Sequence, residues 1–226
     1  MKVIGTPVGR RLWAKALSDI STRTIFRWGT TENYPCPTVP RREAIINTVN
    51  KLKMAKILNE KLGKRFPVLD PNGELAYPVV KKYKYHKRGK LISLAHSDCE
   101  IETERYYYMP FIPTKTEYRV ITDRVGRNYV IFRKIRLNND DFRLNHSLGN
   151  CKFHRVLPEN VPDIVKELAW KSVDALDLIV GGVDIGIGEN KKAIIFEVNS
   201  APQMATVERC LLFKDAVITA IGGSYE

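Results

Sequence analysis

Hydrophobic and polar positions along the chain follow two different periods, which predict where helices and strands lie. Residues 41–63, RREAIINTVNKLKMAKILNEKLG, carry apolar residues at spacings near three and four. The apolar positions are Ile45, Val49, Leu52, Leu58 and Leu62. This period predicts an amphipathic helix, and Gly63 is placed to end it.

Short β-rich segments begin at residue 77. They are YPVVKKY, KLISLA, RYYYMPF, EYRVITDRV and NYVIFRKIRL, separated by Gly, Asn and Asp residues. Runs of this kind predict a largely antiparallel sheet. The polar stretch around residues 138–150 has no clear period and predicts an irregular loop.

The C-terminal part returns to helical spacing and then to strands. Residues 162–178 predict a helix with Pro162 in its first turn. VGGVDIGIG and KAIIFEV predict a hairpin, and a short helix around residues 205–221 follows. Residues 1–40 show little periodicity and predict short strands or loops. The order indicates an α+β fold with helices packed on sheets, and without the strand–helix alternation of a parallel sheet.

Composition is that of a globular chain. With 226 residues, 44% hydrophobic and 27% charged, it lies near the upper end of single-domain size and has room for two lobes. No apolar run approaches the length of a membrane span. We therefore expect no membrane partner and a cytoplasmic location, in the host cytoplasm if the protein is viral.

The net charge of +12 favours a polyanionic partner. A nucleic acid satisfies this balance, and so does a triphosphate site, because both need fixed cations beside phosphate oxygens. Composition alone does not choose between them.

Oxygen ligands gather at the end of the predicted hairpin. Asp184 and Glu197 lie on its two strands, and Asn199 follows Glu197 by two residues, which turns it to the same face. Taken alone, each of these residues would be interpreted as an ordinary side chain that faces solvent at the end of a strand. An apolar strand such as AIIFEV, however, carries an ionised group only where a cation or donor offsets its desolvation. The three together indicate a Mg²⁺ site completed by phosphates.

The tail VDIGIGENKKAIIFEVNSAPQM resembles the last strands of ATP-grasp enzymes, which are carboxylate–amine and carboxylate–thiol ligases. The resemblance implies an ATP-grasp fold, in which two α+β lobes with mainly antiparallel sheets clasp ATP. It also implies that Asp184, Glu197 and Asn199 hold two Mg²⁺ ions, or Mn²⁺ in their place, against the triphosphate. Gln203 stands where the family pattern commonly has glycine.

Other motifs of this family occur in the same order. NKLKMAKILNEKL resembles the helix whose lysine reaches the phosphates, which is Lys51 here, and YPVVKK resembles the strand whose lysine contacts the α-phosphate and adenine region, which is Lys81. YYYMPFIPTKTEYRV resembles the hinge between the lobes, and YVIFRKI the strand that supplies a cation near the γ-phosphate. By resemblance, Met109 and Phe111 contact adenine, and Glu117 accepts the ribose hydroxyls. Arg119 faces the phosphates or the acyl substrate, and Lys134, in preference to Arg133, supplies the cation near the γ-phosphate.

The resemblance divides the chain into a reduced N-terminal segment, 1–44, and an ATP-grasp domain, 45–226. The small lobe is expected at about 75–110 and the large lobe at about 111–226. The basic segment 84–90 occupies the place of the family's glycine-rich loop, with Gly89 as its single glycine. Either its cations act where the family uses backbone N–H groups, or the loop no longer closes over the phosphates. The short N-terminal segment is similar in style to trimmed bacteriophage-type members. Substrate recognition would then rest on the irregular loop around residues 138–150, on the N-terminal segment, or on a partner chain or second copy.

These features predict an ATP-dependent ligase that joins a small-molecule or peptide carboxylate to an amine through an acylphosphate. The alternative is a non-ligating nucleotide-binding module that binds a polyanion such as DNA or RNA. A third reading is a ligase whose acceptor is attached to nucleic acid. Nucleic acid is not the favoured partner, because the three oxygen ligands at the end of the hairpin are intact.

Overall fold

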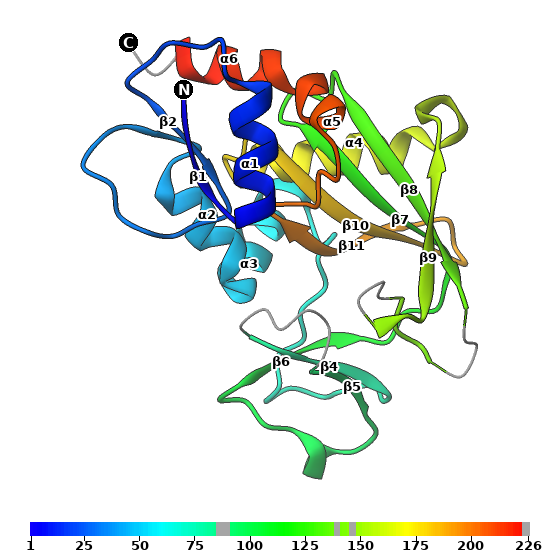
Figure 1. The fold of residues 1–226 in the computed structure, drawn as a ribbon. Coiled ribbons are helices and arrows are strands. Elements are labelled where there is room, and N and C mark those ends of the chain that lie inside the picture. The colour runs from blue at the N-terminus through cyan, green and yellow to red at the C-terminus, as the bar shows by residue number, and fades with distance from the viewer. Residues whose placement is uncertain (85–90, 138–140, 145–147, 223–226) are drawn as a thin grey trace.

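Three separate β-sheets organise the chain, as the ribbon in Figure 1 shows. The computed structural model describes residues 1–84, 91–137, 141–144 and 148–222. A small sheet lies at the bottom of Figure 1, a large sheet above it, and a third short sheet beside the N-terminus. Within the described residues, none of the helices is both long and apolar enough to cross a membrane.

The N-terminal unit is a parallel three-stranded sheet, which the weak periodicity of residues 1–40 did not predict. Its elements are β1 (Lys2–Gly5), α1 (Pro7–Ala16), β2 (Ile25–Trp28) and β3 (Thr38–Val39). Helix α1 begins with proline in its first turn and buries only Gly9, Trp13 and Ala16. Gly9 is required because a Cβ there would lie 2.4 Å from the ring of Trp28. These three buried residues form its short apolar face.

Residues 42–62 form two helices where one was expected. They are α2 (Arg42–Val49) and α3 (Lys51–Leu62). Asn50 separates them: it ends α2, and its side chain accepts a hydrogen bond of 3.1 Å from the Lys53 amide in α3. Asparagine is a preferred residue at this capping position. The break places Lys51 at the N-terminus of a new helix, and Gly63 ends α3 as expected, with φ of 69°.

The small lobe is an antiparallel sheet with strand order β5-β4-β6. Its strands are β4 (Val79–Tyr83), β5 (Ile92–Ala95) and β6 (Tyr106–Pro110). They fall within the expected range of 75–110. Most of the basic segment 84–90 lies outside the described residues, so the expected role of its cations remains a prediction.

The large lobe is a five-stranded antiparallel sheet with strand order β11-β10-β7-β8-β9. Its strands are β7 (Thr114–Asp123), β8 (Tyr129–Arg136), β9 (Cys151–Val156), β10 (Val180–Gly188) and β11 (Ala193–Asn199). Three helices accompany them: α4 (Asp163–Ala175), α5 (Val207–Leu212) and α6 (Lys214–Gly222). The predicted hairpin is confirmed as β10 and β11.

The two faces of this sheet have different environments. Val120 and Ile131 share one hydrophobic core with helices α3 and α4. Ile121 and Val130 point the other way and join a second core with the N-terminal unit, α5 and α6. The rest of this second face, toward the N-terminal end of β7, carries charged side chains beside aromatic ones and borders the cleft shared with the small lobe.

Candidate active site

Asp184 on β10 lies between Glu197 on β11 and Arg119 on β7, each directly opposite it in the antiparallel register. Directly paired residues project to the same face of a sheet, so the three side chains are neighbours. Arg119 Nε and Nη2 each donate to one Asp184 carboxylate oxygen at 2.7 Å. Burial alone would raise the pKa of Asp184, but Arg119 and Lys134 outweigh it and lower that pKa. Asp184 is therefore held as a buried carboxylate anion.

Lys134 on β8 extends this group of charges. Its Nζ lies 3.1 Å from Asp184 Oδ2 and 3.5 Å from Glu117 Oε2. Burial lowers the pKa of Lys134, but Asp184 and Glu117 outweigh this effect and the net pKa is raised. The Thr114 hydroxyl donates to Glu117 at 3.0 Å. In the same strand, Arg133 is exposed and points to the opposite face, so of the two expected cations only Lys134 enters the site.

Lys51 reaches the site from the start of α3. Its Nζ lies 3.0 Å from Glu197 Oε1 and 3.4 Å from the Val198 carbonyl oxygen. The residue is 5% exposed, unusually low for lysine. The helix break at Asn50 explains this position, because it directs the first turn of α3 toward the end of β11.

Lys82 lies in the cleft between the lobes, and Lys81, the residue expected from the sequence, does not. Strand alternation turns the two lysines of β4 to opposite faces. Lys81 Nζ stays within the small lobe, 3.1 Å from the Glu100 carbonyl and over the Tyr106 ring. Lys82 Nζ crosses to the large lobe and donates to the Phe196 carbonyl at 3.4 Å. Burial lowers the pKa of Lys82 to about 8, although Glu197 partly offsets it.

A cleft of about 390 Å³ runs between the two lobes. Its residues include the expected Met109 and Phe111. Its walls combine apolar side chains with charged ones, and the charged residues are Lys82, Glu117, Lys134, Arg136, Arg143, Asp184 and Glu197. Phe196 is a further wall residue, because a bulge in β11 leaves it unpaired between Ile195 and Glu197. The spacing of apolar residues does not reveal a bulge, so Phe196 could not be predicted from the sequence.

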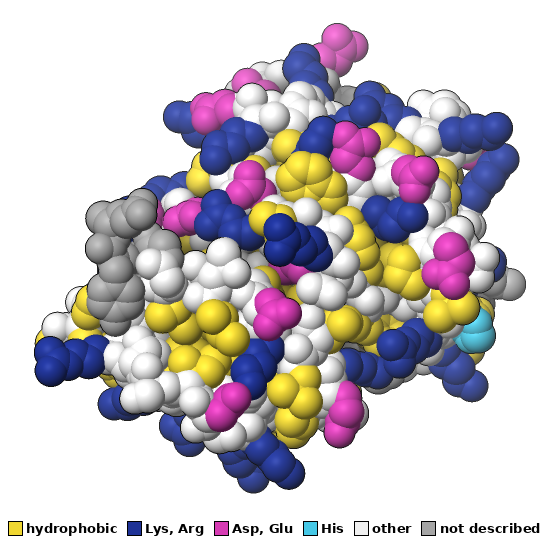
Figure 2. Space-filling model, turned by 90° about the horizontal axis from the view of Figure 1, so that it is seen from above, with side chains coloured by type: hydrophobic (Ala, Val, Ile, Leu, Met, Phe, Trp, Pro, Cys, Tyr) yellow, Lys and Arg dark blue, Asp and Glu magenta, His cyan; other side chains and the backbone are white. Residues whose placement is uncertain are grey.

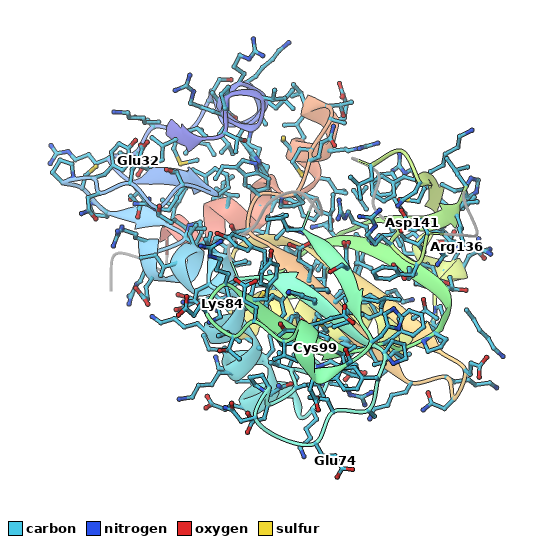
Figure 3. All side chains as sticks on the ribbon, turned by 90° about the horizontal axis from the view of Figure 1, so that it is seen from below. Glu32, Glu74, Lys84, Cys99, Arg136 and Asp141 are labelled. Atoms are coloured by element: carbon cyan, nitrogen blue, oxygen red, sulfur yellow. The ribbon has the colours of Figure 1, made fainter. Side chains whose placement is uncertain are left out.

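The segment 141–144 closes one side of this cleft. Arg136 donates to the Asp141 carbonyl, and Figure 3 shows the two labelled residues side by side at the edge of the large lobe. Phe142 packs edge-on against Phe111 at 6.0 Å between ring centroids. Arg143 forms a 2.8 Å ion pair with Asp141, which holds the pKa of that carboxyl low. Parts of the expected 138–150 loop, namely 138–140 and 145–147, lie outside the described residues.

The oxygen ligands expected for Mg²⁺ are arranged in two register pairs. Asp184 faces Glu197, and Asn199 follows on the same face opposite Gly182. Among the described residues no cluster of three His, Cys, Asp or Glu side chains could by itself hold a metal ion. Two carboxylates and an amide nevertheless suit Mg²⁺, which usually takes one or two protein carboxylates and completes its shell with substrate phosphates. The donor chemistry therefore fits a metal that arrives with a nucleotide.

Comparisons with known proteins agree with this geometry. A family model described as a RimK-like ATP-grasp domain matches residues 67–218. No curated protein sequence matches the chain.

Three solved structures of similar fold are compared here by sequence identity, TM-score and the share of each chain that is covered. N5-carboxyaminoimidazole ribonucleotide synthetase from Thermotoga maritima has 12% identity and a TM-score of 0.61, covering 91% of this chain and 61% of its own. The Aspergillus clavatus synthase bound to ADP and 5-aminoimidazole ribonucleotide has 16% identity and a TM-score of 0.63, covering 87% of this chain and 60% of its own. The ATP-grasp ligase PsnB, in complex with a precursor variant, Mg and ADP, has 12% identity and a TM-score of 0.65, covering 97% of this chain and 97% of its own.

The chain thus spans about three fifths of the length of the two synthetases. These likenesses confirm the ATP-grasp fold that the sequence predicts. With the family model matching two thirds of its length, the chain belongs to the RimK-like ATP-grasp family.

Proposed function

We propose that the protein is an ATP-dependent ligase that joins a carboxylate to an amine through an acylphosphate. The observation that carries this proposal is the set of cations around Asp184 and Glu197 at the cleft. These cations are Lys51, Lys82, Arg119 and Lys134. Phosphoryl transfer depends mainly on positioned positive charge, so this grouping supports a triphosphate site.

The apolar part of the cleft suits the adenine ring. Met109 is buried at the end of β6, and Phe111 follows at the lobe junction. Phe196 faces them from β11, and the Lys82 ammonium lies 5.7 Å from its ring centroid. A nucleotide with its base between these side chains would direct its phosphates toward the lysines. In this proposal Glu117, already bonded to Thr114 and Lys134, accepts ribose hydroxyls.

Asp184, Glu197 and Asn199 are the residues that would hold Mg²⁺. When bound, Mg²⁺ would neutralise charge on the β- and γ-phosphates. In the structure, Glu197 pairs with Lys51, and Asp184 pairs with Arg119 and Lys134. These pairs place the cations where they could meet phosphate oxygens when nucleotide binds.

The chemistry requires no nucleophilic side chain. A substrate carboxylate oxygen attacks the γ-phosphorus, the bond from that phosphorus to the β–γ bridging oxygen breaks, and ADP leaves. An amine nitrogen then attacks the acyl carbon, phosphate leaves and the nitrogen loses a proton, which gives an amide. Lys134 and Arg119 would stabilise the charge that develops during both displacements.

A second candidate function is the non-ligating module that binds a polyanion. The observation that favours it is the charge of residues 1–42, which contain eight Lys and Arg and only two Asp and Glu. Arg10, Arg11 and Lys15 are all exposed on α1. Lys and Arg side chains are also spread over the upper face of the molecule, where α1 and α6 lie (Figure 2).

ADP formation separates the two functions. The purified protein is incubated with ATP, Mg²⁺ and pooled amino acids, and ADP is measured against a sample lacking Mg²⁺. A ligase forms ADP when an acid and Mg²⁺ are present and turns over repeatedly when an amine is added, and Glu197→Gln abolishes ADP formation with an unchanged circular dichroism spectrum. Absence of ADP together with tight, salt-sensitive DNA or RNA binding would favour the module.

A further inference from the structure

A second cavity, of about 870 Å³, lies apart from the cleft between the lobes. Its walls are β3 with the start of α2, the β7–β8 turn, and one side of α6, and we call it the α2–α6 cavity. Among the described residues, none that lines this cavity also lines the cleft. Asp123 borders the cavity at the end of β7, roughly 13 Å along the strand from Arg119. The proposed chemistry gives this cavity no role.

Arginines outnumber acids in the lining of the α2–α6 cavity. The charged residues are Arg41, Arg42, Arg124, Arg127, Asp123, Asp177 and Asp215. Asp177 Oδ1 lies 3.2 Å from Arg124 Nη1. Asp123 accepts hydrogen bonds of 3.0 and 3.1 Å from backbone amides of its own turn. Both carboxylates therefore have partners other than the side chains of the remaining arginines.

Three arginines of this lining differ from Arg124, because no carboxylate in the described part of the chain forms an ion pair with them. They are Arg41, Arg42 and Arg127. Arg42 Nε donates instead to the Thr31 carbonyl, which holds its guanidinium in place. Arg41 and Arg127 are both exposed. Guanidinium groups in this state can bind phosphate oxygens through paired hydrogen bonds.

The start of α2 adds to this positive charge. The helix begins at Arg42 with Arg41 before it, and neither is a residue that usually caps a helix N-terminus. The partial positive charge of the helix N-terminus repels both arginines. Glu43, the acid of the first turn, lies 3.3 Å from Lys53 on α3. An anion in the cavity would offset the repulsion between the helix and its two arginines.

The α6 wall of the cavity supplies hydrogen-bond acceptors. Asp215 is exposed, and no cation in the described residues forms an ion pair with its carboxylate. The Thr219 hydroxyl donates to the Asp215 carbonyl at 2.9 Å, which leaves its own oxygen able to accept. Val39, Ile179 and Ala216 add apolar surface to the same cavity. Such acceptors suit the hydroxyl groups of a sugar, whereas the charge of Asp215 would repel an extended polyanion.

We propose that the α2–α6 cavity binds a sugar phosphate, either as a free molecule or as part of a nucleotide. Arg41, Arg42 and Arg127 donate to the phosphate oxygens. Asp215 and Thr219 accept hydrogen bonds from the sugar hydroxyls. A cavity of about 870 Å³ lies within the size range of sites that enclose small ligands. This inference goes beyond the proposed ligase function and does not depend on it.

Isothermal titration of the full chain with ribose 5-phosphate, inorganic phosphate and ribose tests the proposal. We expect ribose 5-phosphate to bind most tightly, because it alone contacts both the arginines and the α6 wall. Arg41→Ala combined with Arg127→Ala should weaken its binding at least about tenfold, since charge-assisted hydrogen bonds are lost. Asp215→Ala should lower the affinity for ribose 5-phosphate relative to that for phosphate by about fivefold, because only a sugar contact is lost.

A fourth probe, uridine 5′-monophosphate, distinguishes the two sources of the sugar phosphate. If the natural ligand is a nucleotide, this probe should bind more tightly than ribose 5-phosphate, because its base can contact the apolar surface of the cavity. If the natural ligand is a free sugar phosphate, the base gains no contact and the probe should bind more weakly. The arginine double variant should weaken both probes.

The matched control removes two arginines from α1. Arg10→Ala combined with Arg11→Ala changes exposed residues outside the cavity lining. Its affinity should stay within about twofold of wild type, which separates a local contact from general attraction. Lys82→Met removes a charge from the cleft and should leave the binding of ribose 5-phosphate unchanged. Circular dichroism checks that every variant is folded.

Equal affinity of the arginine double variant and the control overturns the proposal, and so does the absence of binding by every phosphate probe. Loss of binding in Lys82→Met but not in the arginine double variant would place the ligand in the cleft and also overturn it. If DNA binds in place of the sugar phosphate and the double variant loses it, the cavity belongs to a nucleic-acid surface and the ligand class is wrong. ADP formation is a separate measurement, so the failure of either proposal leaves the other standing.

Discussion

Arg119 and Asp184 face each other across neighbouring strands, and two guanidinium nitrogens lie 2.7 Å from the two carboxylate oxygens. Lys134 approaches the same carboxylate from the next strand. One buried carboxylate therefore holds two cations in the positions proposed for phosphate contacts. Its removal affects both the fold and the chemistry.

Asp184→Asn is expected to lower ADP formation at least about a hundredfold, because both the proposed Mg²⁺ ligand and the anchor of two phosphate-contacting cations are lost. It should also reduce the free energy of unfolding by about 3 kcal/mol, since the partly buried Arg119 loses its carboxylate partner and the buried Lys134 keeps only Glu117. Urea denaturation and an ADP assay measure the two effects. Asp174→Asn, an exposed acid paired with Arg124, is the control. Equal behaviour of the two variants would contradict the account.

The two lysines of β4 are expected to differ sharply. Lys82→Met should weaken binding of an ATP analogue at least about tenfold, because the charge that it removes lies in the cleft. Lys81→Met removes a charge that contacts Glu100 and Tyr106 within the small lobe, so binding should change less than about threefold. Isothermal titration measures both affinities. A larger loss of affinity for Lys81→Met than for Lys82→Met would support the sequence-based prediction that Lys81 contacts the nucleotide.

Binding of the analogue should weaken as pH rises through about 8, because Lys82 in the cleft loses its proton near that pH. The same group binds fewer protons in the folded state than in the unfolded state above this pH. The free energy of unfolding therefore increases as the pH rises from about 8 toward the ordinary pKa of a lysine side chain. Titrations from pH 7 to pH 9 measure the effect on affinity. Lys82→Arg keeps its charge over this range and should flatten the slope, and an unchanged slope would exclude Lys82 as its source.

Asn50→Ala is expected to lower the free energy of unfolding by about 1 kcal/mol, because the cap of α3 is lost. Since the cap also sets the first turn of α3, Lys51 should contact Glu197 less well and the KM for ATP should rise. Asn50→Asp can accept the same hydrogen bond from the Lys53 amide and should restore both values. Equal stability of the alanine variant and wild type would show that the helix break does not depend on this side chain.

Much of the site could be predicted because it lies on strongly patterned elements. The hairpin of β10 and β11 follows from two apolar runs, and its register makes Asp184 and Glu197 neighbours. The choice between Lys81 and Lys82 could not be made, because adjacent residues on a short strand face opposite ways and either phase fits the pattern. Phe196 depends on a bulge, which adds a residue that no period predicts.

Contacts between segments that are distant along the chain could not be predicted from the sequence either. The ring of Phe132 and the guanidinium of Arg209 meet only because α5 packs beside β8. The parallel sheet at the N-terminus has strands as short as two residues and a helix with three buried positions. Such short elements depend on tertiary packing more than on local preference.

Hydroxylamine trapping tests the central claim most directly. The protein is incubated with ATP, Mg²⁺, hydroxylamine and pooled carboxylic acids, and any acylphosphate is captured as a hydroxamate that mass spectrometry identifies. The account predicts a hydroxamate that requires both ATP and Mg²⁺ and that disappears in Asp184→Asn and Glu197→Gln. A protein that binds the ATP analogue with Mg²⁺ but yields neither hydroxamate nor ADP from any acid would contradict it.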